Sequence, residues 1–225
     1  MGTDLRVGVI DSGCSPMQGR GVLGGRRFWL EDGQLREGEP LPDQLGHGSA
    51  VVEALQREAG PVPLLVAQVF AGQASTSALQ VAAALLWLVE AGATLVNLSL
   101  GLQQDRPVLH QACAEAMAAG VLLCASSPAQ GGPVYPASYP GVIRVTGDAR
   151  CAPGQWSWLG SRQADFGGYA GVGDKAGASL GCAALSGRIA ALLREQPGMP
   201  PQQVHDWLRQ HAAFVGPERR GAKHA

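Results

Sequence analysis

Apolar positions along the chain follow two patterns, short continuous runs and helically spaced stripes. Runs bounded by Gly, Ser or Asp are typical of strands that are buried on both faces. Other segments place apolar residues three or four positions apart, as in Val51, Val52 and Leu55, and this spacing predicts helices. The predicted strands cover residues 5–10, 62–70, 94–98, 121–125 and 141–145. The predicted helices cover residues 47–59, 77–91, 108–119, 179–194 and 201–211.

Helices separate most of the predicted strands, and this alternation is typical of βαβ units. Parallel strands need crossover connections, and helical crossovers cover both faces of the sheet. We therefore expect an α/β fold with three layers, α/β/α, and a mostly parallel central sheet. The Gly- and Pro-rich stretches 126–140 and 153–176 are expected to be loops. We expect a single domain over residues 1–215 and a frayed tail over residues 216–225.

Composition and charge narrow the functional classes. The 225 residues are 46% hydrophobic and 16% charged, against an average of about 25% charged, so the chain can bury a full core. The formal net charge of −1 gives no electrostatic reason for a nucleic-acid or anionic-membrane partner. The most apolar stretch, 79–89, is too short to span a bilayer, and no secretory signal pattern opens the chain. We expect a soluble, cytoplasmic protein that binds neither nucleic acid nor membranes.

Cysteine usage argues against a disulfide framework and against a structural zinc site. The number of cysteines is odd and no two of them form a C-x-x-C pair. No loop gathers several acidic residues in the way that a calcium site requires. We expect neither a metal nor a cofactor. The cysteines are Cys14, Cys113, Cys124, Cys151 and Cys182.

Three polar residues stand where a parallel α/β sheet carries its chemistry, at the carboxyl ends of strands. Asp11 directly follows the first predicted strand, and His47 and Ser179 each open a predicted helix in a Gly-rich segment. A carboxylate can orient an imidazole, and the imidazole can take the proton of a hydroxyl that attacks a carbonyl carbon. Each residue alone is also typical of a turn, a helix cap or a structural histidine. The combination is what indicates an activated serine.

Five motifs surround these residues in a fixed order along the chain. They are Val9-Ile-Asp11-Ser-Gly13, Gly46-His47-Gly48-Ser49, Val96-Asn97-Leu-Ser99-Leu-Gly101, Tyr135-Pro-Ala-Ser-Tyr139-Pro-Gly-Val-Ile143 and Gly177-Ala-Ser179-Leu-Gly181. Together they resemble the motifs of the subtilisin-like serine proteases (subtilases, peptidase S8). The order Asp, His, Ser is that of subtilisin itself. The resemblance covers residues 5–194.

The resemblance implies a serine endopeptidase that acts on a peptide or protein through an acyl-enzyme. Ser179 is then the nucleophile, His47 the general base and acid, and Asp11 the carboxylate that orients the imidazole. The backbone N–H of Ser179 is implied as one oxyanion donor. A partner protein or biosynthetic enzyme is a further, unidentified possibility. An extended segment is expected to bind the substrate backbone as an added strand: Leu98, Ser99, Leu100, Gly101 and Leu102.

The chain departs from the family pattern at three points. The family uses an Asn side chain as an oxyanion donor, but the only Asn here is Asn97, so Ser127 or Gln130 is expected to substitute, unless both are ordinary loop residues. Ala183 stands at the position of the family's Pro, so the helix after Ser179 should be more regular. The chain is also short and the resemblance begins almost at residue 1, from which we expect a member without a prodomain.

These departures leave two other functions open. The missing Asn suggests a non-catalytic, subtilisin-like module that only binds peptide. Ala183 suggests a peptide ligase or cyclase, which transfers the acyl group to an amine instead of water. The acidic segment 28–45 would favour basic substrate residues if it faced the site, although a solvated loop is the alternative.

Two competing assignments of the nucleophile are weaker. The segment Gly177-x-Ser179-x-Gly181 also fits the G-x-S-x-G elbow of α/β-hydrolases. That elbow needs a strand directly before the serine, and residues 171–177 do not have a strand pattern. Cys182 lies three residues past Ser179 on the same predicted helix, almost a full turn further along, where packing is the expected role.

Overall fold

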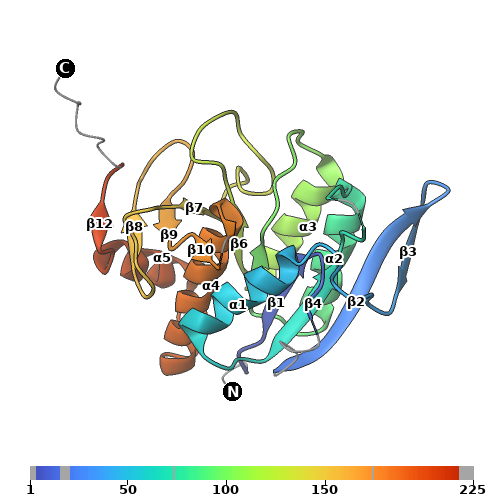
Figure 1. The fold of residues 1–225 in the computed structure, drawn as a ribbon, viewed down its shortest axis with the longest axis horizontal. Helices are drawn as coiled ribbons and strands as arrows, with labels where there is room; N and C mark the ends of the chain where they lie inside the picture. Colours follow the sequence, from blue (N-terminus) through green and yellow to red (C-terminus); the bar gives the residue numbers. More distant parts are fainter. Residues whose placement is uncertain (1–3, 16–20, 73, 174, 218–225) are drawn as a thin grey trace.

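The computed structural model describes residues 4–15, 21–72, 74–173 and 175–217. A ten-stranded sheet runs through the centre, with helices on both of its faces (Figure 1). Its middle strands pair in parallel in the order β7-β6-β5-β1-β4. The prediction of a mostly parallel α/β sheet is confirmed. These strands are β1 (Val7–Asp11), β4 (Leu64–Gln68), β5 (Leu95–Leu98), β6 (Leu122–Ser126) and β7 (Ile143–Gly147).

Further strands extend the sheet at both edges. On the β4 side, β2 (Val22–Glu31) pairs in parallel with β4 and turns back into the antiparallel edge strand β3 (Gln34–Gly38). On the β7 side lie β9 (Phe166–Gly168), β8 (Trp156–Trp158) and β12 (Phe214–Val215). A separate hairpin is formed by β10 (Gly171–Val172) and β11 (Lys175–Ala176).

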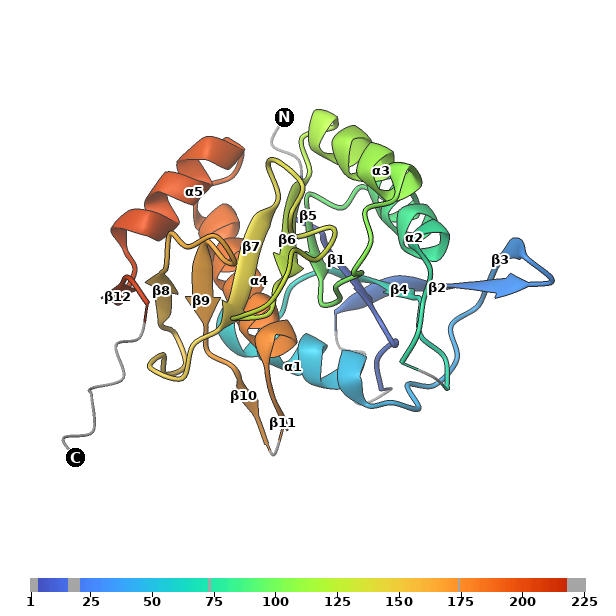
Figure 2. The same cartoon turned by 90° about the horizontal axis from the view of Figure 1, so that it is seen from above.

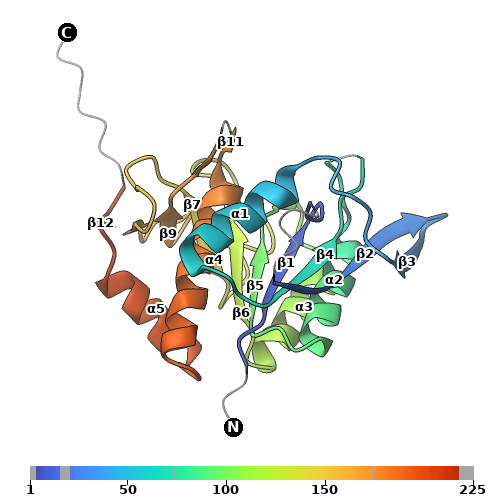
Figure 3. The ribbon, with the colours of Figure 1, turned by 60° about the horizontal axis from the view of Figure 1, so that its bottom comes forward.

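Two helical layers enclose the sheet, as Figures 2 and 3 show from two sides. On one face α1 (His47–Ala59) packs against α4 (Ala178–Glu195), and α5 (Pro201–Gln210) joins the same apolar cluster. On the other face lie α2 (Ala78–Glu90) and α3 (Pro107–Ala118). Alternate residues of β1 divide between the two layers, Val7 and Val9 toward α1 and α4, Ile10 toward α2. This alternation explains why β1 is apolar on both faces.

Two segments expected to be loops contain strands instead. The acidic segment 28–45 holds the end of β2 and all of β3, and the segment 153–176 holds β8, β9, β10 and β11. The strand β9 was not recognised in the sequence, because Phe166-Gly-Gly168 lacks the alternating apolar and polar side chains that identify a strand. Gly168 is required there, since a Cβ atom would lie 2.1 Å from the carbonyl oxygen of Gly181 in α4.

The segment 126–140 is irregular beyond Ser126, as expected, and holds one bridge between Leu102 and Tyr135 and a cis peptide bond before Pro136. Of the expected tail 216–225, residues 218–225 lie outside the described residues. None of the helices in the described ranges combines the length and apolarity needed to cross a bilayer.

Candidate active site

Asp11 and His47 form the centre of the site. Asp11 ends β1 and its side chain is fully buried, whereas the His47 side chain, the first of α1, is 41% exposed. Nδ1 of His47 lies 2.8 Å from Oδ1 of Asp11, and the same oxygen accepts a hydrogen bond from the backbone N–H of Ser12 at 2.7 Å. The imidazole is therefore held by a buried carboxylate on one side and open to a substrate on the other.

Glycine lets the start of α1 approach the turn after β1 closely enough for this contact. A Cβ atom on Gly48 would lie 2.1 Å from the carbonyl oxygen of Gly13. Gly46, which precedes the helix, has a φ of 63°, in the left-handed region that favours glycine. The Gly-His-Gly pattern thus lets His47 lie against Asp11. A side chain at Gly48 would clash with Gly13, and one at Gly46 would strain its left-handed backbone conformation.

The pKa of His47 is raised above its ordinary value. The hydrogen bond to Asp11 is the largest cause, burial opposes it, and the negative charges of Asp11 and Asp43 add to it. The ammonium of Lys175 in β11 acts in the opposite direction; its Nζ donates to the carbonyl oxygen of Gly46 at 2.6 Å. Two nearby charges of opposite sign therefore tune the same imidazole.

Asp43 organises the beginning of α1, which has no side-chain cap of its own. Its carboxylate accepts hydrogen bonds from the Ser12 hydroxyl (2.8 Å), the Gly46 N–H (2.9 Å), and the N–H and hydroxyl of Ser49 (2.8 and 2.6 Å). Burial raises the pKa of Asp43, but these hydrogen bonds outweigh it and leave the pKa below its ordinary value. A carboxylate at this end also complements the helix dipole.

Ser179 is the second residue of α4 and is joined to Ser99 by two hydrogen bonds. Its hydroxyl donates to the backbone carbonyl of Ser99 (3.1 Å), and the Ser99 hydroxyl donates to the backbone carbonyl of Ser179 (3.2 Å). Across the described residues, the hydroxyl of Ser179 forms no hydrogen bond to His47. Ser99 lines the same cavity as Asp11 and His47, whereas Ser179 is not part of that lining.

A buried polar chain holds Ser99 in turn. The Asn97 amide donates to the Ser99 hydroxyl (2.7 Å), and the Ser186 hydroxyl, two turns beyond Ser179 on α4, donates to Oδ1 of Asn97 (3.1 Å). Asn97 and Ser186 are completely buried. Because Ser186 and Ser179 belong to one helix, these hydrogen bonds fix α4 against β5 close to the candidate nucleophile.

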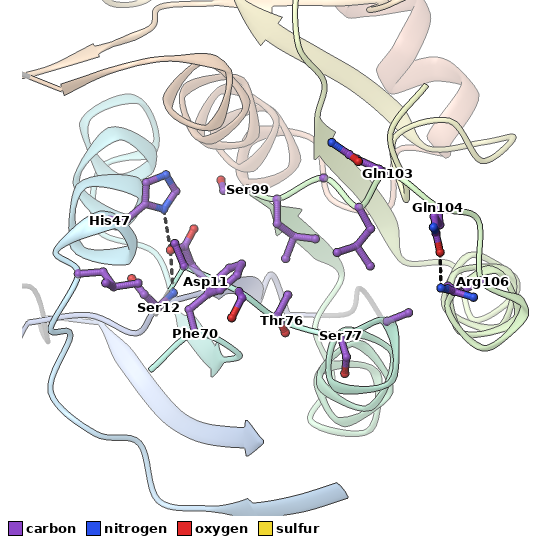
Figure 4. A pocket seen from close by; sticks show the side chains of 17 residues that line it. Asp11, Ser12, His47, Phe70, Thr76, Ser77, Ser99, Gln103, Gln104 and Arg106 are labelled. Carbon is purple, nitrogen blue, oxygen red and sulfur yellow. Dashed lines mark hydrogen bonds and ion pairs between the residues drawn. The ribbon is translucent and has the colours of Figure 1, made fainter. Parts of the chain in front are cut away.

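A cavity of about 880 Å³ lies in front of Asp11 and His47, between the β4–α2 and β5–α3 connections. Figure 4 shows His47, Asp11 and Ser99 grouped toward one end, and Gln104 and Arg106 at the other. Its apolar lining comes from four large side chains and from Ala74 and Ala78. These four are Leu45, Phe70, Leu100 and Leu102.

The expected substrate segment is only partly suited to its role. Leu98 was expected to bind substrate, and this is wrong, because it is fully buried and its strand is paired with both β1 and β6. The backbone N–H and C=O of Leu102 are both bonded to Tyr135. Ser99, Leu100 and Gly101 line the cavity. In the part of the chain that the structure describes, no hydrogen bond occupies the backbone of Leu100 or Gly101.

The two expected oxyanion donors lie in different surroundings. Ser127 is buried and follows β6, the strand next to β5, and its backbone N–H is bonded to Val145. Gln130 is exposed and lines a second cavity, of about 600 Å³, together with Asp148 and Gln163. The second cavity shares no lining residue with the first.

The structure also bears on the acidic segment, on Cys182 and on the question of a metal site. In the acidic segment 28–45, Glu31 and Glu37 pair with Arg36 and Arg26 on the β2–β3 hairpin, and neither lines the cavity. Cys182 is completely buried, with its pKa raised well above the ordinary value by burial. The described ranges contain no group of three or more His, Cys, Asp and Glu side chains that could ligate a metal.

Four residues of the site were missed from the sequence. Asp43 is recognisable only as an acidic residue four positions before His47, and Ser186 only as a polar residue on an apolar helix face. Lys175 and Arg106 carry no local signal, because chain topology alone brings them to the site.

Sequence comparison finds relatives among bacterial proteases, although no family model matches the chain. An intracellular serine protease of Paenibacillus polymyxa is 30% identical over 165 residues, which cover 64% of this chain and 49% of the relative. Alkaline elastase YaB of a Bacillus species is 33% identical over 156 residues and 39% of its length. Subtilisin DY of Bacillus licheniformis is 29% identical over 160 residues and 56% of its length. The chain thus spans about half the length of these relatives.

Solved structures agree with the fold over nearly the whole chain. A lanthipeptide protease superposes with a TM-score of 0.70 and 19% identity, covering 95% of this chain and 81% of that protein. The prenylagaramide maturation protease PagA superposes with a TM-score of 0.65 and 22% identity, covering 92% and 82%. At these identities the likeness concerns the fold.

Proposed function

The chain belongs to the subtilisin-like serine protease family, and we propose that it is a serine endopeptidase that cleaves a peptide or protein through an acyl-enzyme. The observation that carries the proposal is the 2.8 Å contact between His47 Nδ1 and the buried Asp11. A carboxylate on Nδ1 leaves Nε2 as the basic atom, which is the arrangement a serine nucleophile needs.

In the proposed reaction the Ser179 hydroxyl leaves the Ser99 carbonyl and turns to Nε2 of His47. Its oxygen attacks the substrate carbonyl carbon while His47 takes the proton. His47 then returns that proton to the leaving amine, and the acyl-enzyme forms as the C–N bond breaks. Water, deprotonated by His47, releases the acyl group. Asp11 keeps its charge throughout and stabilises the imidazolium.

Oxyanion stabilisation is assigned to the beginning of α4. The N–H of Ser179 belongs to the first turn of this helix, where backbone N–H groups have no intrahelical acceptor and the dipole favours negative charge. A second donor is assigned to Ser127, because it follows the strand adjacent to the one that leads to Ser99. Gln130 is the alternative.

The substrate is proposed to bind as an extended strand along Leu100 and Gly101, whose backbone groups are unoccupied in the described structure and line the cavity. Processing of a specific peptide, with a partner or biosynthetic enzyme nearby, is proposed by analogy with the lanthipeptide protease and PagA. A cytoplasmic location is proposed from relatives named intracellular serine proteases.

Each of the two alternative functions is supported by one specific observation. A non-catalytic peptide-binding module fits the absent oxyanion Asn and the Ser179 hydroxyl bonded to Ser99 instead of His47. A peptide ligase fits Ala183, since α4 runs from Ala178 to Glu195 with no proline. Product analysis with an added amine separates the ligase from the hydrolase, because only the ligase yields an aminolysis product in preference to the acid.

A fluorophosphonate probe tests the main proposal. Wild type should be labelled, and Ser179→Ala and His47→Ala should lose the label, because the probe reports an activated serine. The matched controls are Ser75→Ala, a serine elsewhere on the cavity lining, and His110→Ala, an exposed histidine on α3. Both should keep it. Equal labelling of Ser179→Ala and wild type, or labelling lost equally in the controls, would overturn the assignment.

A further inference from the structure

The cavity beside His47 is electrostatically asymmetric. Its lining contains three ionisable side chains, and two of them, Asp11 and His47, are bonded to each other. The third, Arg106, lies at the opposite end (Figure 4). An extended peptide that reaches from His47 along Leu100 and Gly101 therefore ends beside an isolated positive charge.

Arg106 has no carboxylate partner among the residues that the structure describes. It is exposed, and its guanidinium donates to the side-chain oxygen of Gln104, a neutral amide. The neighbouring carboxylate of Asp105 accepts a hydrogen bond from the Tyr139 hydroxyl at 2.8 Å and does not line the cavity. The charge of Arg106 is thus available to a ligand.

Two helices add to the positive potential at this end. Ser77, the N-cap of α2, and Arg106, the N-cap of α3, both line the cavity. The first turns of α2 and α3 contain no acidic residue. Each helix N-terminus is equivalent to about half a positive charge, and neither is neutralised from within its own helix.

We infer that Arg106 selects substrates with an acidic side chain at a position set back from the cleaved bond, so that Glu or Asp reaches the far end of the cavity. This inference rests on the proposed protease function and specifies its substrate class. A guanidinium binds a carboxylate through two parallel N–H···O hydrogen bonds. The apolar wall between His47 and Arg106 accepts uncharged side chains at the intervening positions.

Lys175 is the other cation near the site, but it does not serve this role. Its ammonium is bonded to the Gly46 carbonyl, and it does not line the cavity. A preference caused by Lys175 would concern a different substrate position from one caused by Arg106.

Quenched fluorescent decapeptides of uncharged residues provide the test, each with a single Glu, Gln or Lys at a successive position. At one position away from the cleaved bond, wild type should cleave the Glu peptide about twofold to fivefold faster in kcat/KM than the Gln peptide, the range that an exposed ion pair supplies. Arg106→Gln should abolish the difference and Arg106→Glu should favour Lys. High salt should reduce it in wild type. Arg36→Gln, an equal charge change on β3 outside the cavity lining, should keep it.

Binding separates this inference from the proposed function. The same peptides are titrated against Ser179→Ala and Ser179→Ala/Arg106→Glu by fluorescence anisotropy. Cleavage without any charge preference, or a preference unchanged in Arg106→Glu, overturns the inference and leaves the protease proposal intact. Arg106-dependent binding of Glu peptides without cleavage by wild type supports the inference and overturns the protease proposal. If no peptide is bound and none is cleaved, the inference is overturned.

Discussion

Ser179 and Ser99 hold each other through two hydrogen bonds, each hydroxyl donating to the other's backbone carbonyl at 3.1 and 3.2 Å. The candidate nucleophile thus has its proton directed at the Ser99 carbonyl, just beyond β5, and not at His47. In the proposed reaction this hydroxyl leaves the Ser99 carbonyl before it donates to His47, so we expect a substrate that displaces it to promote the proton transfer.

The Ser99 hydroxyl should matter more for turnover than the Ser186 hydroxyl. Ser99→Ala and Ser186→Ala each leave a buried group of Asn97 unpaired, which costs about 1–3 kcal/mol of unfolding free energy. Only Ser99→Ala also frees the Ser179 backbone, so it should lower kcat about tenfold to a hundredfold with a smaller change in KM. Urea denaturation and steady-state kinetics check both. Equal kcat losses in the two variants would contradict the special role of Ser99.

The pH profile should respond in opposite directions to two nearby charges. In the proposed mechanism neutral His47 is the active form, so kcat/KM should rise as pH rises through its pKa, which lies above the ordinary value of about 6.5. Lys175→Met removes a charge that lowers the pKa of His47, so the acid limb should move to higher pH. Asp43→Asn removes a charge that raises this pKa, so the limb should move to lower pH.

The control for this pair is Arg36→Met on the β2–β3 hairpin, which should leave the acid limb unchanged. Circular dichroism establishes that each variant is folded. Shifts of the same sign in Lys175→Met and Asp43→Asn would show that packing, and not charge, governs the His47 pKa.

Gly48→Ala should be far more damaging than its size suggests. The added Cβ would lie 2.1 Å from the Gly13 carbonyl oxygen, a backbone atom that cannot turn aside. Forced overpacking of this kind costs about 1–3 kcal/mol or more of unfolding free energy. Moving α1 away from Asp11 should also lower the His47 pKa, measurable by NMR titration. Gly132→Ala, where a Cβ meets nothing within 4 Å, is the matched control, and a comparable loss there would contradict the steric explanation.

The second oxyanion donor is tested by Ser127→Ala and Gln130→Ala. Removal of one such donor costs about 10²–10³ in kcat, a value measured in a subtilisin. We expect Ser127→Ala to show this loss in kcat, because Ser127 follows the strand beside β5. The free energy of unfolding should change little. Gln130→Ala should show none, since Gln130 lines the other cavity. The reverse outcome would move the donor to Gln130.

The sequence predicted the central fold because its signals are local. The apolar run of β1 and the helical spacing of α1 need no distant residue to be recognised. The β2–β3 hairpin and β9 were missed because both contain glycine pairs, Gly24-Gly25 and Gly167-Gly168, which remove the alternation that identifies a strand. Glycine there allows close packing instead.

For the candidate site, the motifs pointed to Asp11, His47 and Ser179, but not to the residues that support them. Ser186 reaches Asn97 only through the packing of α4 on β5, and Lys175 reaches Gly46 only because the β10–β11 hairpin folds back over α1. Leu98 was misjudged because a motif does not reveal whether its strand is central or at an edge. Such contacts depend on tertiary geometry.

The acid–base pair and the walls of the cavity come from separate parts of the architecture. Asp11 and His47 are carried by β1 and α1, whereas the walls are the crossover connections that lead into α2 and α3. The β5–α3 connection begins at Ser99, which is bonded to Ser179, whereas the β4–α2 connection carries none of the proposed reactive groups. We therefore expect new sequences grafted into the β4–α2 connection to change the selectivity of the proposed protease while Asp11, His47 and Ser179 keep their places.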